Sequence, residues 1–536
     1  MDMTKGKRLA AALCCLQFMG LPAGQAAGAE GSAVEAQLQA TFPDAVEAGE
    51  EYALNRRLFK GYQGRGTMLL DNHGVRQVAI YINGHRLPLA EPLPDGELQL
   101  AIGGYCRDGD NTLKVLQLQP ADGKLTIRIP YPTLVTGAPA QVGMSAKKLA
   151  QVDEVLEQDV KNGFPGAVLF IVKDGRIVKE SAYGWAKLYE QRQQLAPDQR
   201  EPMRTDTMFD LASNTKMYAV ILSFMKLMDE GKVNPEDPIV KYLPEYRGEG
   251  RENIRIRDVM THSAGYAPLV PFHKPQAGAF YSRQREKTIA LLPKVPLTYP
   301  VGAKTVYSDT DYMLLAALLE RITGERLDVY TEKHIYQPLG LSHTVFNPLQ
   351  KGYQAGDFAA TEPCGNTRSG MIDFPGIRTY TLQGEAHDEL AWYSMGGVSG
   401  HAGLFSRPED MAVLAQLLLN RGGYGKYRLC RPEIFDYFTR PTNRNARFGL
   451  GWNKMVFPDR IWEFGPYASP AAIAHTGWTG IDICIDPKYD LAVLLFTNRV
   501  HALNVPGDPN TFLTNDFAAC SYGSIMSLVY EAFLEK

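Results

Sequence analysis

Cysteine is scarce in this sequence of 536 residues, which contains only seven. Cys14 and Cys15 lie together near the N-terminus, and the C-x-x-C spacing of a zinc or redox site is absent. The ten histidines show no H-E-x-x-H spacing either, so we expect no metal and no cofactor. The other cysteines form no disulfide framework, which predicts a fold stabilised by its core. They are Cys106, Cys364, Cys430, Cys484 and Cys520.

An excess of one charge is also missing, because 56 Lys and Arg stand against 59 Asp and Glu. Without a basic stripe, binding to nucleic acid is not expected. There is no phosphate-binding loop, no dinucleotide fingerprint and no G-x-S-x-G elbow. A hydrophobic content of 45% with 21% charged residues is typical of a globular protein, and the length predicts two or three domains.

No apolar run reaches the length of about 20 residues that a membrane-spanning helix needs. The N-terminus has Lys5, Lys7 and Arg8, then "LAAALCCLQFMGLPAG", then small residues with an A-x-A match at 27–29. This layout predicts a secretory signal peptide over residues 1–29 and export to the periplasm or the extracellular space. An uncleaved anchor or a buried helix is the alternative. We expect peripheral membrane association or none.

Short alternating runs separated by turn residues occupy residues 45–135, among them "QVAIYING", "NTLKVLQLQP" and "KLTIRIPYP". They predict a small antiparallel β-sandwich, preceded by a helical lead-in within 30–60. The runs resemble galactose-binding-like sandwiches, which implies a carbohydrate contact; a purely structural or docking module is the alternative. Residues 136–144 are interpreted as a linker.

Residues 145–536 read as helix, strands, a long helical stretch, strands and a final helix. The first helix is "SAKKLAQVDEVLEQDVKNG", and the strand signals are "PGAVLFIVKDGRIVKESAYG", "IAHTGWTGIDICID" and "DLAVLLFTN". This order predicts an α+β fold: an antiparallel sheet covered by terminal helices, with a large helical insertion between its halves.

In "DLASNTKMYAV", Ser213 and Lys216 stand three positions apart, on one face of a predicted helix. A serine hydroxyl becomes a good nucleophile when a neighbour takes its proton, and a lysine can do this if burial lowers its pKa. The helix start also offers N–H groups to a developing oxyanion. The alternative is a helix cap beside a solvated lysine.

Two further motifs suggest chemistry. "TVYSDTDYMLL" contains Tyr307, Ser308 and Asp309 ahead of an amphipathic helix, for which a simple helix cap is the alternative. "AHTGWTG" places His475 and the following Thr-Gly on a predicted strand, where a glycine allows a substrate backbone to approach. A strand-end turn is the alternative there.

Taken together in this order, the three motifs resemble the serine β-lactamase/penicillin-binding-protein superfamily, in its class C β-lactamase-like branch. Further matching stretches are "IRIRDVMTHSAGY", "YQPLGLSHTVF" and "GGVSGHAGLFSRPEDMAVLAQLLLN". The resemblance implies a β-lactamase/transpeptidase-like fold over residues 145–536.

The resemblance also implies roles. Ser213 is the acylated nucleophile, Lys216 takes or relays its proton, and Tyr307 is the partner base that later protonates the leaving group. The backbone N–H groups of Ser213 and Trp478 form the oxyanion hole. The implied substrate-binding residues are Asp309, His475, Thr476 and Gly477, of which the His-Thr pair holds a substrate carboxylate.

Two positions depart from the family pattern. Many relatives have asparagine where this chain has Asp309, and a carboxylate can only accept hydrogen bonds. We therefore expect close pairing with Lys216, a protonated lysine and a weaker grip on a standard β-lactam side chain. Many relatives have lysine in place of His475, so we expect carboxylate binding to strengthen as pH falls through the histidine pKa.

The resemblance implies an exported serine hydrolase that acts through an acyl-enzyme on cell-wall peptides, as a D-alanyl-D-alanine carboxypeptidase does. The expected partner is a peptidoglycan-derived peptide or another small acyl substrate. A β-lactamase, an esterase, or a non-catalytic penicillin- or wall-binding protein of the same fold are the alternatives. His401 either lines the pocket or is structural, and His262 is expected to be buried and hydrogen-bonded.

Overall fold

The computed structural model describes residues 36–42, 56–120 and 122–534. The predicted signal peptide lies outside these residues. Within them, no helix combines the length and the apolar character that crossing a membrane requires.

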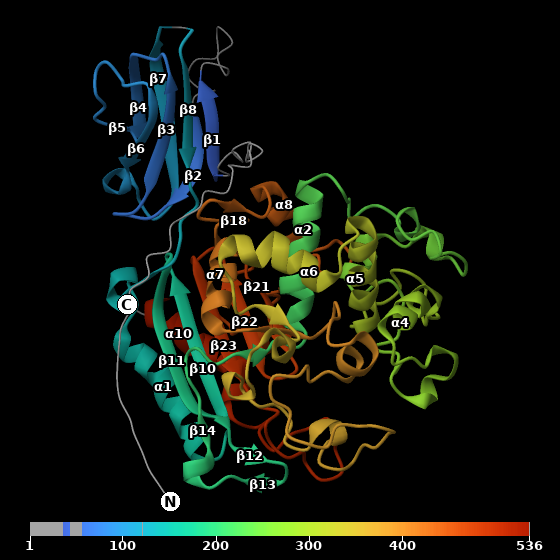
Figure 1. The fold of residues 1–536 in the computed structure, drawn as a ribbon. Helices are drawn as coiled ribbons and strands as arrows, with labels where there is room; N and C mark the ends of the chain where they lie inside the picture. The colour runs from blue at the N-terminus through green and yellow to red at the C-terminus, as the bar shows by residue number, and fades with distance from the viewer. Residues whose placement is uncertain (1–35, 43–55, 121, 535–536) are drawn as a thin grey trace, which may run out of the picture. The chain divides into compact units, whose positions relative to one another are not determined.

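The N-terminal part consists of two four-stranded antiparallel sheets, coloured blue in Figure 1. Their strand orders are β1-β8-β3-β6 and β2-β7-β4-β5, and apolar side chains of both sheets form one core. In β8, Leu125, Ile127 and Ile129 are buried and the residues between them are not, which is the period of two that the sequence predicts. The strands are β1 Leu38–Phe42, β2 Arg56–Gly61, β3 Thr67–His73, β4 Gln77–Ile82, β5 His85–Arg86, β6 Gly96–Ala101, β7 Gly109–Gln119 and β8 Lys124–Ile129.

The helical lead-in expected within residues 30–60 is wrong where the structure describes this segment. Residues 38–42 pair with β8 and residues 56–61 pair with β7, both antiparallel. Sheet pairing outweighs the local helix propensity because it buries Leu38, Phe42 and Phe59 in the sandwich core. The first strand therefore precedes residue 45, where the sequence pattern placed the start of the sandwich.

An eight-stranded sheet forms the centre of the larger part, with the order β14-β11-β10-β23-β22-β21-β20 and β9 added beside β11. All pairings are antiparallel except β9 with β11. Distant segments of the chain are thereby adjacent, because β10 lies next to β23. The strands are β9 Val135–Thr136, β10 Gly166–Lys173, β11 Arg176–Lys187, β14 Glu201–Pro202, β20 Asn453–Lys454, β21 Ile473–Gly477, β22 Ile481–Asp486 and β23 Leu491–Thr497.

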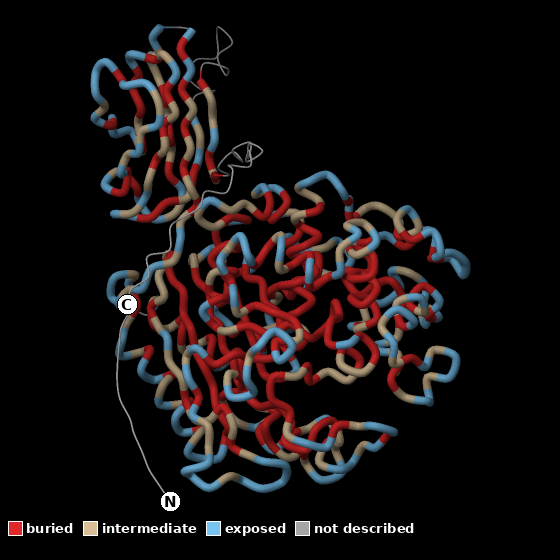
Figure 2. The backbone as a smooth tube through the Cα atoms, viewed as in Figure 1, coloured by how far each residue is buried: buried red, intermediate tan, exposed pale blue. Residues whose placement is uncertain are grey.

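Both faces of this sheet are covered, as Figures 1 and 2 show. Alternate side chains of β10 enter two different cores. Ala167, Leu169 and Ile171 pack in the core under the terminal helices α1 (Ala146–Lys161) and α10 (Tyr522–Leu534). The side chains between them pack against the helical insertion; they are Val168, Phe170 and Val172. The predicted α+β fold is confirmed.

The helical insertion runs between β14 and β20 and carries much of the functional site. It contains a small sheet of order β15-β17-β16, which leads directly into the Ser213 turn. Its main helices are α2 Leu222–Asp229, α3 Ile256–Met260, α4 Arg285–Leu291, α5 Asp309–Thr323, α6 Leu327–Thr331, α7 Pro408–Leu419 and α8 Pro432–Thr439, and its small sheet is β15 Phe209–Asp210, β16 Val345–Phe346 and β17 Leu404–Ser406.

Candidate active site

Ser213 lies in a tight turn between β15 and the following helix. The Asp210 carboxylate accepts a hydrogen bond from the Ala212 N–H at 2.8 Å, and Ala212 has the unusual φ of +44°. Ser213 is partly exposed, and the helix after it begins as a π-helical segment, Lys216–Ile221, that continues into α2. The sequence predicted an ordinary α-helix here. Single π-helical turns are frequent at functional sites.

Lys216 is fully buried, and its ammonium group donates to three oxygen atoms. Its Nζ lies 2.9 Å from Ser213 Oγ, 2.9 Å from Asp309 Oδ1 and 3.2 Å from the His401 carbonyl oxygen. Burial acts to lower the pKa of Lys216, but the Asp309 carboxylate and Tyr307 outweigh it and the pKa is raised. The resting lysine is therefore charged, as the aspartate led us to expect.

Tyr307 reaches the same point from the loop before α5. The residue as a whole is 42% exposed, and the Lys216 Nζ lies 4.7 Å from the ring centroid. Desolvation raises the pKa of Tyr307, while Lys216 and a hydrogen bond with Ser213 act to lower it. The resting group is thus a neutral phenol in contact with both the nucleophile and the lysine.

His262 packs against the Tyr307 ring and is hydrogen-bonded to the backbone of the next residue, Ser308. Its ring centroid lies 4.6 Å from that of Tyr307, and its Nδ1 lies 3.1 Å from the Ser308 backbone nitrogen and 2.9 Å from Asp311 Oδ2. The expectation that His262 is buried and hydrogen-bonded is confirmed. Burial, Lys216 and His475 lower its pKa well below the ordinary value, so this histidine is neutral.

Strand β21 brings His475, Thr476 and Gly477 to the Ser213 turn. With its side-chain amide suitably oriented, Asn214 donates to the His475 carbonyl at 3.0 Å and accepts from the Gly477 N–H at 3.2 Å. A Cβ on Gly477 would lie 2.6 Å from the Leu211 carbonyl oxygen. The glycine thus permits β21 to approach the nucleophile turn, whereas the sequence suggested room for a substrate.

His475 does not carry the charge that a carboxylate needs. It is buried, and its Nδ1 donates to the Thr476 carbonyl at 2.8 Å. Burial lowers its pKa to about 3, with Lys216 acting in the same direction. The expectation that His475 changes its charge between pH 5 and 8 is therefore wrong.

The two predicted oxyanion donors are free to act. Within the described residues, neither the Ser213 N–H nor the Trp478 N–H donates to another protein group. Both residues line one cleft of about 550 Å³. Tyr307, His475, Thr476 and Gly477 line it too, so the cleft has room for an acyl group beside the nucleophile.

Sequence reasoning missed several residues of this cleft. Some are charged or aromatic and come from segments that carry no motif, and only Arg499 follows a recognisable signal, the end of the apolar strand β23. Side chains at such strand ends often bind ligands. The missed lining residues are Phe448, Asn453, Arg460, Trp462, Arg499, Asn515, Cys520 and Tyr522.

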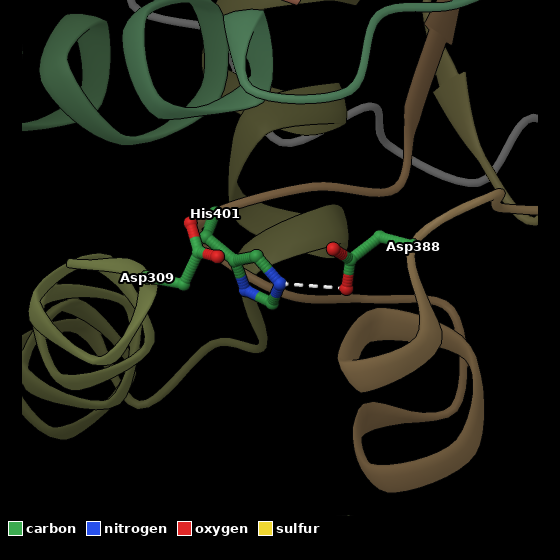
Figure 3. Close-up of side chains that lie close together, drawn as sticks. All are labelled: Asp309, Asp388 and His401. Atoms are coloured by element: carbon green, nitrogen blue, oxygen red, sulfur yellow. Dashed lines mark hydrogen bonds and ion pairs between the residues drawn. The ribbon is translucent and has the colours of Figure 1, made fainter. Parts of the chain in front are cut away.

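His401, whose carbonyl oxygen accepts from Lys216, has its side chain between the carboxylates of Asp309 and Asp388 (Figure 3). The side-chain ligand atoms of the three residues all lie within 4.8 Å of one another, a spacing that suits a metal ion. However, both His401 nitrogens are already hydrogen-bonded, at 2.8 Å to Asp388 and at 2.8 Å to Ser399. Asp309 is shared with the Lys216 ammonium, which would repel a cation. The arrangement favours a network that neutralises charge over a metal site.

Comparisons with known proteins identify the family of this chain. The family model described as beta-lactamase matches residues 152–515. A protein of Bacillus subtilis (strain 168) named N-acetylmuramyl-L-alanine amidase is 48% identical over 412 residues, covering 75% of this chain and 92% of its own. A protein of Salmonella paratyphi B, named as a proposed D-alanyl-D-alanine carboxypeptidase, is 44% identical over 414 residues, covering 75% and 95%. A crystal structure of a penicillin-binding protein homolog from Caulobacter crescentus matches 73% of this chain and 99% of its own with a TM-score of 0.52, at 20% identity.

Proposed function

This chain belongs to the β-lactamase family, and on that premise we propose that it is a serine hydrolase that forms an acyl-enzyme on Ser213. The observation that carries the proposal is the Lys216 ammonium. It lies 2.9 Å from Ser213 Oγ and 2.9 Å from Asp309 Oδ1, at one end of an open cleft. A buried lysine in contact with a partly exposed serine is the arrangement of a nucleophile beside its base, and the lysine can act as that base once the site has lost a proton.

In the proposed mechanism, Ser213 Oγ attacks the carbonyl carbon of the bound substrate. Lys216 and Tyr307 are both protonated at rest, so the pair first releases one proton to solvent. It then accepts the proton of Ser213 Oγ as the serine attacks. The N–H groups of Ser213 and Trp478 stabilise the oxyanion. Tyr307 returns a proton to the leaving group, and water or an amine then releases the acyl group from the serine.

We propose cell-wall peptides as the substrates. Two relatives support this choice, since one is named as a carboxypeptidase of D-alanyl-D-alanine and the other as an amidase of N-acetylmuramyl-L-alanine. The first name implies cleavage at the C-terminal end of the stem peptide. The amidase name implies cleavage between the sugar and its peptide. Because that relative is 48% identical to this chain, amidase activity is kept as the second candidate.

Incubation with a mixture of muropeptides, followed by mass spectrometry, tests both candidates. Carboxypeptidase activity releases free D-alanine, whereas amidase activity separates the whole peptide from the disaccharide. S213A is expected to abolish either product. Intact-protein mass spectrometry after addition of penicillin then locates the adduct: a long-lived one on Ser213 favours the wall enzyme, and rapid turnover favours a β-lactamase. No product and no adduct would favour a non-catalytic binding protein.

We also propose that the protein is exported, on the basis of its N-terminal sequence. N-terminal sequencing of protein recovered from the periplasm or the medium tests this, and a mature end near residue 30 is expected. For the β-sandwich we propose a contact with wall carbohydrate. Retention on purified peptidoglycan, compared with that of a variant lacking residues 30–135, measures it.

A further inference from the structure

Two arginines line the cleft, and they differ in their partners. Arg460 lies beside a carboxylate, because its Nη1 is 3.3 Å from Glu463 Oε2, and its Nη2 donates to Asn453 Oδ1 at 3.2 Å. Its guanidinium also packs near the ring of Trp462, at 5.8 Å from the centroid. The protein itself thus supplies a counter-charge for Arg460.

Arg499 has only neutral partners. Its Nη1 donates to Asn515 Oδ1 at 3.0 Å and its Nη2 donates to the Trp478 carbonyl oxygen at 2.8 Å. Its Nε is buried and has no hydrogen-bond partner. In the part of the chain that the structure describes, no carboxylate forms an ion pair with this guanidinium. A charge that is partly removed from water and lacks a counter-ion is costly unless a ligand completes the site.

The position of Arg499 relates it to the reaction centre. Arg499 lies two residues after the end of β23, and its Nη2 donates to the carbonyl oxygen of Trp478. The N–H of the same Trp478 is the proposed oxyanion donor. The guanidinium lies over the Trp478 ring, 5.4 Å from its centroid. A substrate whose carbonyl oxygen binds the Trp478 N–H therefore has its neighbouring groups within reach of Arg499.

His475 is neutral, so it does not supply the positive charge that would bind a substrate carboxylate. Wall peptides are anionic, and the strand residue expected to hold a carboxylate is a neutral imidazole. A planar guanidinium suits a carboxylate better than any other side chain, since it offers paired, parallel N–H donors.

We propose that Arg499 is a specificity-determining residue that binds a substrate carboxylate one or two residues from the scissile carbonyl. This inference rests on the proposed function, because it concerns the substrate of the same cleft. The carboxylate belongs either to the leaving group, as in a C-terminal amino acid, or to the acyl side, as in an acidic stem-peptide residue.

Two matched pairs of thioesters distinguish these sources. The two thioesters of the first pair share an N-acylglycyl group. Their leaving thiols differ: one is thioglycolate and the other is the neutral thioglycolamide. The second pair shares a neutral leaving thiol and carries an N-succinyl or an N-succinamoyl group. Release of free thiol gives kcat and KM for each substrate with wild type, R499Q and R499K.

Wild type is expected to prefer the carboxylate member of one pair by about 10-fold to 100-fold in kcat/KM, mostly through KM. R499Q should abolish that preference, so that kcat/KM becomes equal for the two members of the pair, and R499K should keep part of it. R204Q is the matched control, because Arg204 pairs with Asp206 at the surface and its loss changes the net charge equally. This control should retain the full preference.

Binding of the same four compounds to S213A, measured by calorimetry, reads the Arg499 effect without turnover. If turnover is absent but S213A binds the carboxylate compound and S213A/R499Q does not, the function proposed above is wrong and the role of Arg499 stands. Thermal unfolding verifies that each variant is folded. An unchanged carboxylate preference in R499Q, or equal binding of both members of each pair by the parent protein, overturns the inference.

Discussion

At the scale of single residues, the distinctive feature of the site is the carboxylate of Asp309 against the Lys216 ammonium. The 2.9 Å contact and the fully buried lysine make this a strong interaction, because the local dielectric is low. It raises the pKa of Lys216 against the effect of burial. An asparagine at this position would leave the lysine easier to deprotonate.

Replacing Asp309 by asparagine is therefore expected to lower the pKa of Lys216 and to speed acylation near neutral pH. The rising limb of the pH–rate profile should move to lower pH by about one unit or more, since an adjacent opposite charge shifts a pKa by about 1–3 units. The amide can also donate to a β-lactam side chain, so labelling of D309N by fluorescent penicillin should be faster. Stopped labelling reactions from pH 5 to 9 measure both effects.

The exposed Asp206, which pairs with Arg204, provides the control as D206N. This variant loses the same charge at an exposed residue that does not line the cleft, and its profile should match that of wild type. If the rising limb of the D309N pH–rate profile does not move and the rate of penicillin labelling is unchanged, the Asp309 carboxylate does not raise the pKa of Lys216 as proposed.

His475 gives a second prediction at this scale, with the opposite outcome to that expected from its sequence position. Burial lowers its pKa to about 3, so the ring stays neutral throughout pH 5–8. KM for a carboxylated substrate should accordingly stay flat between pH 5 and 8, within about twofold. A KM that falls on acidification through pH 6–7 would show instead that this imidazole binds as a cation.

At the scale of elements, the site depends on the close approach of β21 to the Ser213 turn. The Asn214 side chain bridges the two segments, and Gly477 leaves no side chain between them. This contact places the Trp478 N–H, one residue beyond the strand, next to the nucleophile. The alignment of the oxyanion donors is thus a property of two packed elements.

G477A is expected to disrupt this alignment, because its Cβ would lie 2.6 Å from the Leu211 carbonyl oxygen. Backbone must shift to relieve the overlap, at a cost of about 1–3 kcal/mol in unfolding free energy. Penicillin labelling of Ser213 should fall at least about 10-fold. Chemical denaturation and labelling rates measure the two effects separately.

G356A is the matched control, since a Cβ on Gly356 meets no heavy atom within 4 Å. Its φ also lies outside the left-handed region. This variant should keep wild-type stability and labelling. Equal behaviour of the two variants would mean that the β21 contact does not set the site.

Much of this arrangement could be predicted from the sequence, because β21–β23 are short, largely apolar segments separated by turns and the terminal helices have helical spacing. The family resemblance drawn from the three motifs is confirmed by the family match. Other features depend on tertiary contacts that no local pattern reports. The strand at 38–42, the π-helical start at Lys216 and the neutral state of His475 each follow from burial against distant segments. The end of the apolar strand β23 marks the position of Arg499, but its partners Trp478 and Asn515 come from other segments, so its place in the cleft could not be predicted.

At the scale of the molecule, the central sheet separates two hydrophobic cores that relate differently to the proposed active site. One core, under α1 and α10, contains none of the proposed catalytic side chains. The other lies among the insertion helices and includes the residues that follow Lys216, from Met217 to Leu222. The first core reaches the cleft at Tyr522 but not at the Ser213 turn, so it should contribute mainly stability, whereas the second should contribute stability and the geometry of the nucleophile.

Two matched leucine truncations test this division. Leu156 in α1 is 1% exposed and Leu222 at the start of α2 is fully buried, so each change to alanine should lower the unfolding free energy by about 2–5 kcal/mol. L156A should keep the wild-type rate of Ser213 labelling per folded molecule, because its cavity opens on the far side of the sheet. L222A should lose labelling as well, because Leu222 packs in the core that holds the helix carrying Lys216. Equal loss of labelling in both variants, at a temperature where each is folded, would mean that the sheet transmits packing defects from one core to the other.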